Sequence, residues 1–235
     1  MAPDGVSVHV ARVPLGDVRT FSDPPGPDNA IELLARLPLH SIVYPFTTSS
    51  YLLGTNGEQA LRARLEKRSN GIPVLMSMIA AAAAIRALEV QRIASFHPPW
   101  FADDVVQKGV AYFQSHGFEV VHASHLTPAR EVPHPNVGSD VNPVELYDWV
   151  RNHAPSNMEC VFIAGNGFRA IGVIAALEED LGRPVLTANQ AALLGCPHSG
   201  TKERLVVRLL AQRKLRFKLS RFSIEAYYTQ PSSKR

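Results

Sequence analysis

The segment Thr47-Thr-Ser-Ser50 places four hydroxyl groups in a row directly after a short apolar run. It precedes a stretch rich in Ala, Leu, Arg and Glu, which are good helix formers. A turn at this place presents hydroxyls and unpaired backbone N–H groups at the positive end of a helix dipole, where a carboxylate binds well. Ser and Thr also cap helices in many proteins, so simple N-capping is the alternative interpretation.

The segment Gly165-Asn-Gly167 follows a second apolar run in the same way. Glycines on both sides of Asn166 let the backbone approach a ligand closely or adopt a positive φ. An ordinary tight turn is the alternative. Arg169, two residues further on, either binds a carboxylate or only caps and pairs on its own helix.

His97 is the best candidate for moving a proton, because it ends a third apolar run and imidazole titrates near neutral pH. A packing role is the alternative, as it is for Trp100, which could also line a pocket. We expect no metal site at His122, His125 and His134, since no Cys, Asp or Glu accompanies them at ligand spacing.

Apolar runs and helix-like stretches alternate along the chain, which favours βαβ units, a mainly parallel sheet and the α/β fold class. Period-2 alternation predicts a strand over Val6–Val10, and Asn142 followed by Pro143 predicts the start of a helix. The remaining strands are expected at residues 41–44, 73–76, 92–96, 118–122, 160–164 and 184–187, and the remaining helices at 57–68, 79–89, 102–115 and 168–181.

A short internal repeat supports this order. Gly71-Ile-Pro-Val-Leu75 recurs as Gly182-Arg-Pro-Val-Leu186, each time after a predicted helix. The two turns described above precede these helices at corresponding places. A match of this length also arises by chance, but the shared order supports a duplication. We therefore expect two pseudo-symmetric α/β lobes with mainly parallel sheets, and a site in the crevice where their strand C-termini face each other.

Three segments carry a resemblance to a known family: Tyr44-Pro-Phe-Thr-Thr-Ser-Ser50, Ala164-Gly-Asn-Gly-Phe-Arg169 and Gly182-Arg-Pro-Val-Leu-Thr-Ala-Asn-Gln-Ala191. In order, they resemble the maleate cis-trans isomerase and arylmalonate decarboxylase branch of the aspartate/glutamate racemase superfamily. That branch has a strand ending in Tyr-x-Cys-Thr-Ser-Gly-Ser, a second ending in Ser-Cys-Thr-Asn-Phe-Arg, and Gly-Lys-Pro-Val leading to Ser-Asn-Gln-Ala. The pattern Gly-Asn-Gly-Phe-Arg is similar to the subgroup associated with ectoine utilisation.

The resemblance implies two cysteines that face each other across a small carboxylic acid. One thiolate attacks or deprotonates, and the other returns a proton; arylmalonate decarboxylases keep only the second. Here the two positions hold Phe46 and Gly165, and neither residue transfers a proton. Cys160 lies within a predicted strand and is expected to be a buried apolar residue, and Cys196 lies beyond the matched region.

What the resemblance retains is a carboxylate cradle. It implies substrate-binding roles for Thr47, Thr48, Ser49, Gly165, Asn166, Gly167 and Asn189. His97 stands near the place of a family tyrosine in Thr-Pro-Tyr and stays the candidate catalytic residue.

We therefore expect an enzyme that isomerises, racemises or decarboxylates a small carboxylic acid through an enolate-like intermediate, without the usual cysteine pair. No cofactor and no metal is expected. The alternative is a non-catalytic or defective family member that only binds a small carboxylate.

The expected domain boundaries follow from the repeat and the resemblance. Residues 1–90 with 183–195 form the first lobe, 91–182 the second, and 196–235 a basic tail. The opening strand of the family has no counterpart, so we expect the first lobe to lack it. Leu194-Gly-Cys-Pro-His-Ser199 replaces an apolar helix of the family, and our hypothesis for this change is a frameshift. Lys214–Leu219 alternates cationic and apolar residues, as a membrane- or RNA-contacting strand would, but a solvated tail is the simpler interpretation.

Charge is unevenly distributed along the 235 residues. Ten of the 24 Lys/Arg and two of the 21 Asp/Glu lie in residues 196–235, which leaves 14 basic and 19 acidic residues, a net charge of −5, on the rest. We therefore expect no nucleic-acid partner. No apolar run reaches the ~18 residues of a membrane span, so no membrane association is expected. Two cysteines and a start unlike a signal peptide favour the cytoplasm, and homo-oligomerisation is left open.

Overall fold

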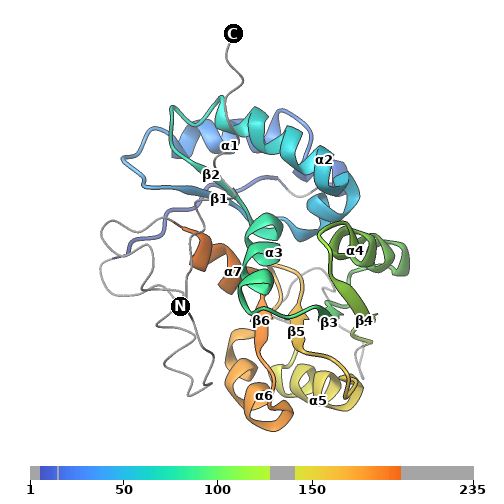
Figure 1. Cartoon of the computed structure of the whole chain (residues 1–235). Helices are drawn as coiled ribbons and strands as arrows, with labels where there is room; N and C mark the ends of the chain where they lie inside the picture. The colour runs from blue at the N-terminus through green and yellow to red at the C-terminus, as the bar shows by residue number, and fades with distance from the viewer. Residues whose placement is uncertain (1–5, 15, 128–140, 197–235) are drawn as a thin grey trace.

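The computed structural model describes residues 6–14, 16–127 and 141–196, so His134 and the tail beyond Cys196 lie outside the described residues (Figure 1). The strands are β1 (Ile42–Tyr44), β2 (Val74–Met76), β3 (Arg92–His97), β4 (Glu119–His125), β5 (Cys160–Ile163) and β6 (Val185–Thr187). The helices are α1 (Gly26–Leu34), α2 (Thr47–Glu66), α3 (Ser77–Ala87), α4 (Asp103–Ser115), α5 (Pro143–His153), α6 (Ile174–Leu181) and α7 (Ala188–Gly195), with 3-10 turns η1 (Val18–Phe21) and η3 (Ile171–Val173).

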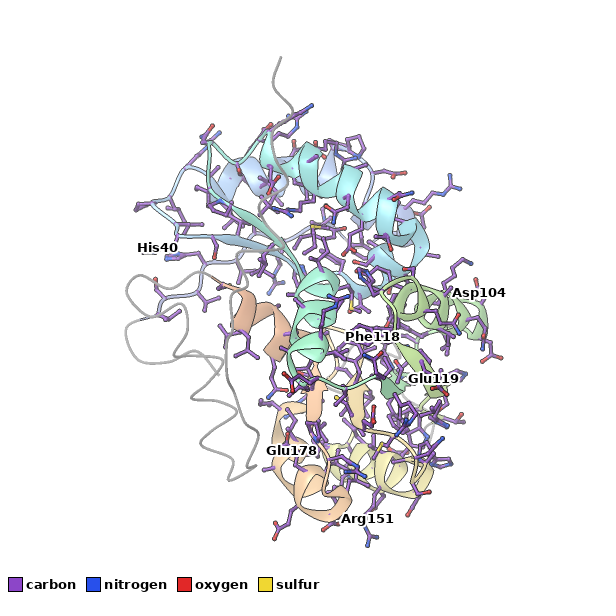
Figure 2. All side chains as sticks on the ribbon, in the orientation of Figure 1. His40, Asp104, Phe118, Glu119, Arg151 and Glu178 are labelled. Atoms are coloured by element: carbon purple, nitrogen blue, oxygen red, sulfur yellow. The ribbon has the colours of Figure 1, made fainter. Side chains whose placement is uncertain are left out.

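The larger sheet is parallel throughout, with the strand order β4-β3-β5-β6. Strands β3, β5 and β6 are buried on both faces, because alternate residues belong to two apolar cores, whereas the edge strand β4 is half-buried. Ile93 and Phe162 pack toward α3, α4 and α7, whereas Phe96 and Val161 pack toward α5 and α6. Burying a side chain of this kind is worth about 1.5–3 kcal/mol, so helices on both faces hold the sheet in place. Figure 2 shows Asp104 and Arg151 projecting outward from α4 and α5.

The smaller sheet contains β1 and β2, also parallel, and packs beneath α1 and α2. Its register repeats that of β5 and β6. Val74 and Leu75 pair with Ile42 and Val43, as Val185 and Leu186 pair with Val161 and Phe162. The helix that follows each pair, α3 or α7, packs against the other. The α/β class with parallel sheets predicted from the sequence is therefore confirmed, and the Pro-Val-Leu repeat marks equivalent strands.

Two features of the structure differ from what the sequence predicts. Residues 6–10 form no strand, and Val8 and Val10 are 69% and 76% exposed, because an alternating apolar face gains nothing without a neighbouring strand to cover it. Helix α1 was not predicted, although a proline near its first turn is a favoured start. Strand β6 pairs with β5 in the larger sheet, and α7 contacts both β6 and β2. The division into lobes as a whole stays a prediction.

Helix α2 packs both on the smaller sheet, at β2, and against α4, which covers the larger sheet. Gly54 has φ 63° and ψ −179°, so the helix is kinked after its second turn. Beyond the kink, the Glu58 carboxyl is fully buried and lies 2.6 Å from Ser50 Oγ and 2.5 Å from Tyr112 Oη of α4. Burial raises the pKa of Glu58. The Tyr112 bond joins α2 to α4, and the Ser50 bond spans the kink within α2. Together they satisfy the buried carboxyl.

Helix α4 comes close to Tyr51 of α2 at Gly109. A Cβ there would lie 2.6 Å from Tyr51 Cε2, and Tyr51 is itself enclosed by Phe101, Tyr112 and Phe113. Because the ring has no free space to move into, overpacking outweighs the better helix propensity of alanine.

We expect Gly109→Ala to lower the free energy of unfolding by about 1–3 kcal/mol, measured from urea denaturation curves. Gly172→Ala is the matched control, since a Cβ there meets nothing within 4 Å, and we expect a change within about 0.5 kcal/mol. A Gly109→Ala protein as stable as the wild type would show that α4 lies further from Tyr51.

Candidate functional site

Four parallel strands deliver their C-terminal residues to one region. Strand β1 leads to Thr47, β3 to His97 and Pro98, β5 to Gly165 and β6 to the start of α7. In an open α/β sheet, ligands bind outside the carboxyl ends of the strands. Thr47, which follows β1 of the smaller sheet, hydrogen-bonds there to Asn166, which follows β5 of the larger sheet. The crevice expected between the two lobes stays a prediction.

Thr47, Asn166 and Asn189 form a hydrogen-bonded cluster in this region. Asn166 Oδ1 accepts from the Thr47 backbone N–H at 3.2 Å and from the Thr47 hydroxyl at 2.8 Å. Asn166 Nδ2 donates to Asn189 Oδ1 at 3.0 Å, and Asn189 Nδ2 returns a bond to the Asn166 carbonyl at 2.8 Å. Three residues predicted to bind substrate, separated by up to 142 positions in the chain, therefore lie together.

The local structure explains why Thr47 is placed there. It is the first residue of α2, where backbone N–H groups have no partner within the helix. Asn189 lies in the first turn of α7, which begins with a capping box between Thr187 and Gln190. The sequence Thr-x-x-Gln is a recognisable start signal that could have predicted α7.

The other predicted binding residues occupy different surroundings. Ser49 is buried, and its hydroxyl accepts from Tyr44 Oη at 3.2 Å, beneath the helix rather than beside Asn166. Thr48 is half-buried one residue after Thr47. Gly167 is exposed, and a Cβ there would lie 3.6 Å from the Trp100 ring, which also stacks edge-on against Phe168. Trp100 thus borders the turn after β5.

The family model for arylmalonate decarboxylase matches residues 29–204. This chain belongs to the arylmalonate decarboxylase family. Among solved structures, an unliganded arylmalonate decarboxylase matches with a TM-score of 0.67 at 18% identity, over 80% of this chain and 79% of that chain.

Maleate isomerases have the same fold. Nocardia farcinica maleate cis-trans isomerase bound to TRIS matches with a TM-score of 0.66 at 19% identity, over 87% of this chain and 80% of that chain. A cysteine-to-alanine variant of the maleate isomerase Iso from Pseudomonas putida, with maleate, matches with a TM-score of 0.62 at 19% identity, over 72% and 67% of the two chains. No curated protein sequence matches this chain. The resemblance stated from the three motifs is therefore confirmed at the level of family and fold.

In this member of the arylmalonate decarboxylase family, Phe46, which the motif resemblance places at the first cysteine position, lies in an aromatic cluster. Phe46 stacks on Phe21 with ring centroids 4.7 Å apart and lies 5.0 Å from the ring of Tyr44. An aromatic ring held on two sides contributes packing and neither accepts nor donates a proton.

At Gly165, which the resemblance places at the second cysteine position, the surroundings disfavour a side chain. Gly165 has φ +85°, and a Cβ there would lie 2.8 Å from Pro98 Cγ. A cysteine at this position would need both a strained backbone and a displaced proline ring. Cys160 is fully buried in β5, where burial raises the pKa of its thiol. The two-cysteine chemistry has no replacement thiol in the described part of the crevice.

His97 is fully buried at the end of β3 rather than open to the crevice. Its Nδ1 donates to the Ser124 carbonyl at 3.1 Å, which leaves Nε2 as the acceptor, 3.2 Å from Ser95 Oγ and 3.5 Å from Tyr51 Oη. Burial lowers the pKa of His97 to about 4, so the ring is neutral at pH 7. These contacts join β3, β4 and α2. The catalytic role of His97 stays a prediction, and its observed contacts are structural.

No group of three His, Cys, Asp or Glu side chains that could hold a metal occurs among the described residues.

A hollow of about 620 Å³ lies at the far end of α2, lined by Glu32, Arg36, Arg64, Lys67, Arg68 and Asn70. The buried Asp28 carboxylate holds Arg64 and Arg68 there, at 3.0 and 2.7 Å. This hollow lies where α1 contacts α2, away from the cluster of Thr47, Asn166 and Asn189.

Arg169, a possible carboxylate-binding residue in the sequence, is exposed. Within the described ranges, no helix is long and apolar enough to cross a membrane.

The buried histidine predicts an acid-labile fold. An unfolded histidine binds a proton below about pH 6.5, whereas folded His97 binds it only below about pH 4, so stability falls as the pH drops between these values. We expect this residue to remove about 1.4 kcal/mol of unfolding free energy per pH unit in that interval.

His97→Gln removes this pH-dependent contribution. The unfolding free energy of the variant should therefore fall less steeply with decreasing pH, although the variant is less stable than the wild type at pH 7. Urea denaturation at several pH values between 4 and 7 measures both slopes. Equal slopes in the two proteins would mean that His97 takes up its proton at the same pH in the folded and the unfolded state.

Proposed function

We propose that this chain binds a small carboxylic acid in the crevice and isomerises, racemises or decarboxylates it through an enolate-like intermediate. Family membership supports the class of enzyme, and the geometry of Thr47 supports the binding mode. The backbone N–H and the hydroxyl of Thr47 converge on a single oxygen atom, Asn166 Oδ1. A carboxylate oxygen is a stronger acceptor for the same two donors than an amide oxygen.

The chemical role of the site follows from these donors. Removing a proton or CO₂ next to a carboxyl group leaves negative charge on the carboxyl oxygens. Neutral donors fixed at the start of a helix stabilise that charge without having to reorganise. Thr47, Thr48 and the amides around Asn166 supply this stabilisation. The proton then comes from a group other than the family cysteines, since Phe46 and Gly165 occupy those positions.

Known relatives suggest the ligands to try. The Pseudomonas putida enzyme was crystallised with maleate, and a Nocardia farcinica maleate cis-trans isomerase mutant carries a succinylcysteine intermediate. A covalent thioether of that kind needs a thiol at a position that Phe46 or Gly165 fills here, so our proposal contains no covalent step. Association with ectoine utilisation and a cytoplasmic location are part of the same proposal.

A second candidate, a protein that binds a carboxylate without turning it over, is favoured by one observation. Pro98 occupies the space of a side chain at Gly165, so the site has been rebuilt rather than merely stripped of one sulfur atom.

One experiment separates the two candidates. The protein is incubated in deuterium oxide with maleate, aspartate or phenylmalonate, and substrate and product are followed by proton NMR. Turnover of aspartate or phenylmalonate places solvent deuterium at the carbon next to the carboxyl group. Maleate, whose isomerisation needs a covalent addition, serves as a binding probe only. A ligand that raises the melting temperature without such exchange supports the pure binder. The proposal is contradicted if none of the three acids raises the melting temperature and none takes up deuterium.

Thr47→Val tests the binding mode, because valine keeps the volume and the backbone N–H but removes the hydroxyl donor. A hydrogen bond to a charged group is worth about 1.5–3 kcal/mol, so the affinity for the stabilising acid should fall about 10- to 100-fold. Isothermal titration calorimetry measures the change.

The control is Thr55→Val, on the same helix, whose hydroxyl bonds Ser115 Oγ at 2.8 Å. It should leave the affinity unchanged. An unchanged affinity in Thr47→Val would show that the acid binds elsewhere.

A further inference from the structure

The Thr47 donors are already occupied by the protein itself. Thr47 is only 2% exposed, and the half-buried Asn166 accepts hydrogen bonds from both of its donors. The hydroxyl-to-oxygen distance of 2.8 Å and the amide-to-oxygen distance of 3.2 Å are those of full hydrogen bonds. A ligand therefore reaches these donors only if Asn166 Oδ1 leaves them.

Two hydrogen bonds to Asn189 fix the position of the Asn166 amide. Its Nδ2 is held by Asn189 Oδ1, and its own carbonyl is held by Asn189 Nδ2. The backbone before it is turned by the positive φ of Gly165, which packs against Pro98. The amide oxygen is thus aimed from the turn after β5 at the start of α2, across the crevice.

We infer that Asn166 is an internal occupant of the carboxylate hole and makes the site selective for ionised acids. The inference rests on the proposed function of this crevice. A ligand with a neutral amide oxygen gains nothing by replacing another amide oxygen. A carboxylate forms charge-assisted bonds, which are roughly twice as strong, to the same two donors and therefore displaces Asn166. Asn166 then determines specificity, rather than serving only as one more ligand-binding group.

The first test measures ligand affinity with maleate and with the neutral diamide of maleate as probes. Asn166→Ala removes the occupant, so we expect maleate to bind about tenfold more tightly, equivalent to about 1.4 kcal/mol, and the diamide to become a detectable ligand. Calorimetry on the wild type and the variant measures both. If Asn166→Ala weakens maleate as Thr47→Val does, Asn166 is a binding group and the inference is wrong, while the proposed function stands.

The second test needs no added ligand. Asn166→Asp places a tethered carboxylate on the Thr47 donors. Because this change also removes the Nδ2 donor to Asn189 Oδ1, the readout is the pH dependence. The melting temperature relative to the wild type should rise between pH 3 and pH 7, since the Thr47 donors favour the charged form. The folded pKa of that Asp is then lowered, so the gain is present above about pH 4 and lost as the pH falls below it. Maleate binding should be lost at pH 7.

The matched control is Asn56→Asp on the exposed side of α2, which should change neither quantity. An Asn166→Asp protein that gains no stability relative to the wild type between pH 3 and pH 7 would overturn the inference, because the hole would then not favour an anion. If Asn166→Asp is stabilised but no acid binds the wild type or Asn166→Ala, the hole is an anion site and the proposed substrate class is wrong. The two failures are therefore distinguishable.

Discussion

Thr47 starts α2 directly after the strand and turn that lead into it, and both of its donors face Asn166 on the other sheet. This contact depends on the parallel pairing within each sheet, since only parallel strands bring successive C-termini to one edge. The equivalent registers of β1 with β2 and of β5 with β6 put the two turns in corresponding places. Helices α3 and α7, which follow these pairs, then pack against each other and hold the two edges together.

Much of this arrangement could be predicted from the sequence. Strands such as β2 and β6 are short apolar runs, and the shared Pro-Val-Leu motif identifies them as equivalents. The predicted cradle residues Thr47, Asn166 and Asn189 do lie together, because each follows a strand end. What the sequence could not provide is the direction of individual side chains. Ser49 turns to Tyr44, and Val8 and Val10 point to solvent despite their strand-like alternation.

His97 shows why a residue type at a strand end is insufficient to assign a role. Its ring lies inside, where Ser124, Ser95 and Tyr51 satisfy both nitrogens. Desolvation of a buried imidazole favours its neutral form, and the sequence holds no record of that burial. Likewise, the sequence does not reveal that the backbone at Gly165 has a positive φ and lies against the Pro98 ring, which together disfavour a side chain there.

The central claim is that a small carboxylate binds at the start of α2. A crystal structure of the protein soaked with maleate tests it most directly. The account predicts a carboxylate oxygen about 2.7–3.2 Å from both the backbone nitrogen and the hydroxyl of Thr47, with the Asn166 side chain rotated away. Maleate bound elsewhere, while Thr47 keeps both hydrogen bonds to Asn166, would contradict it.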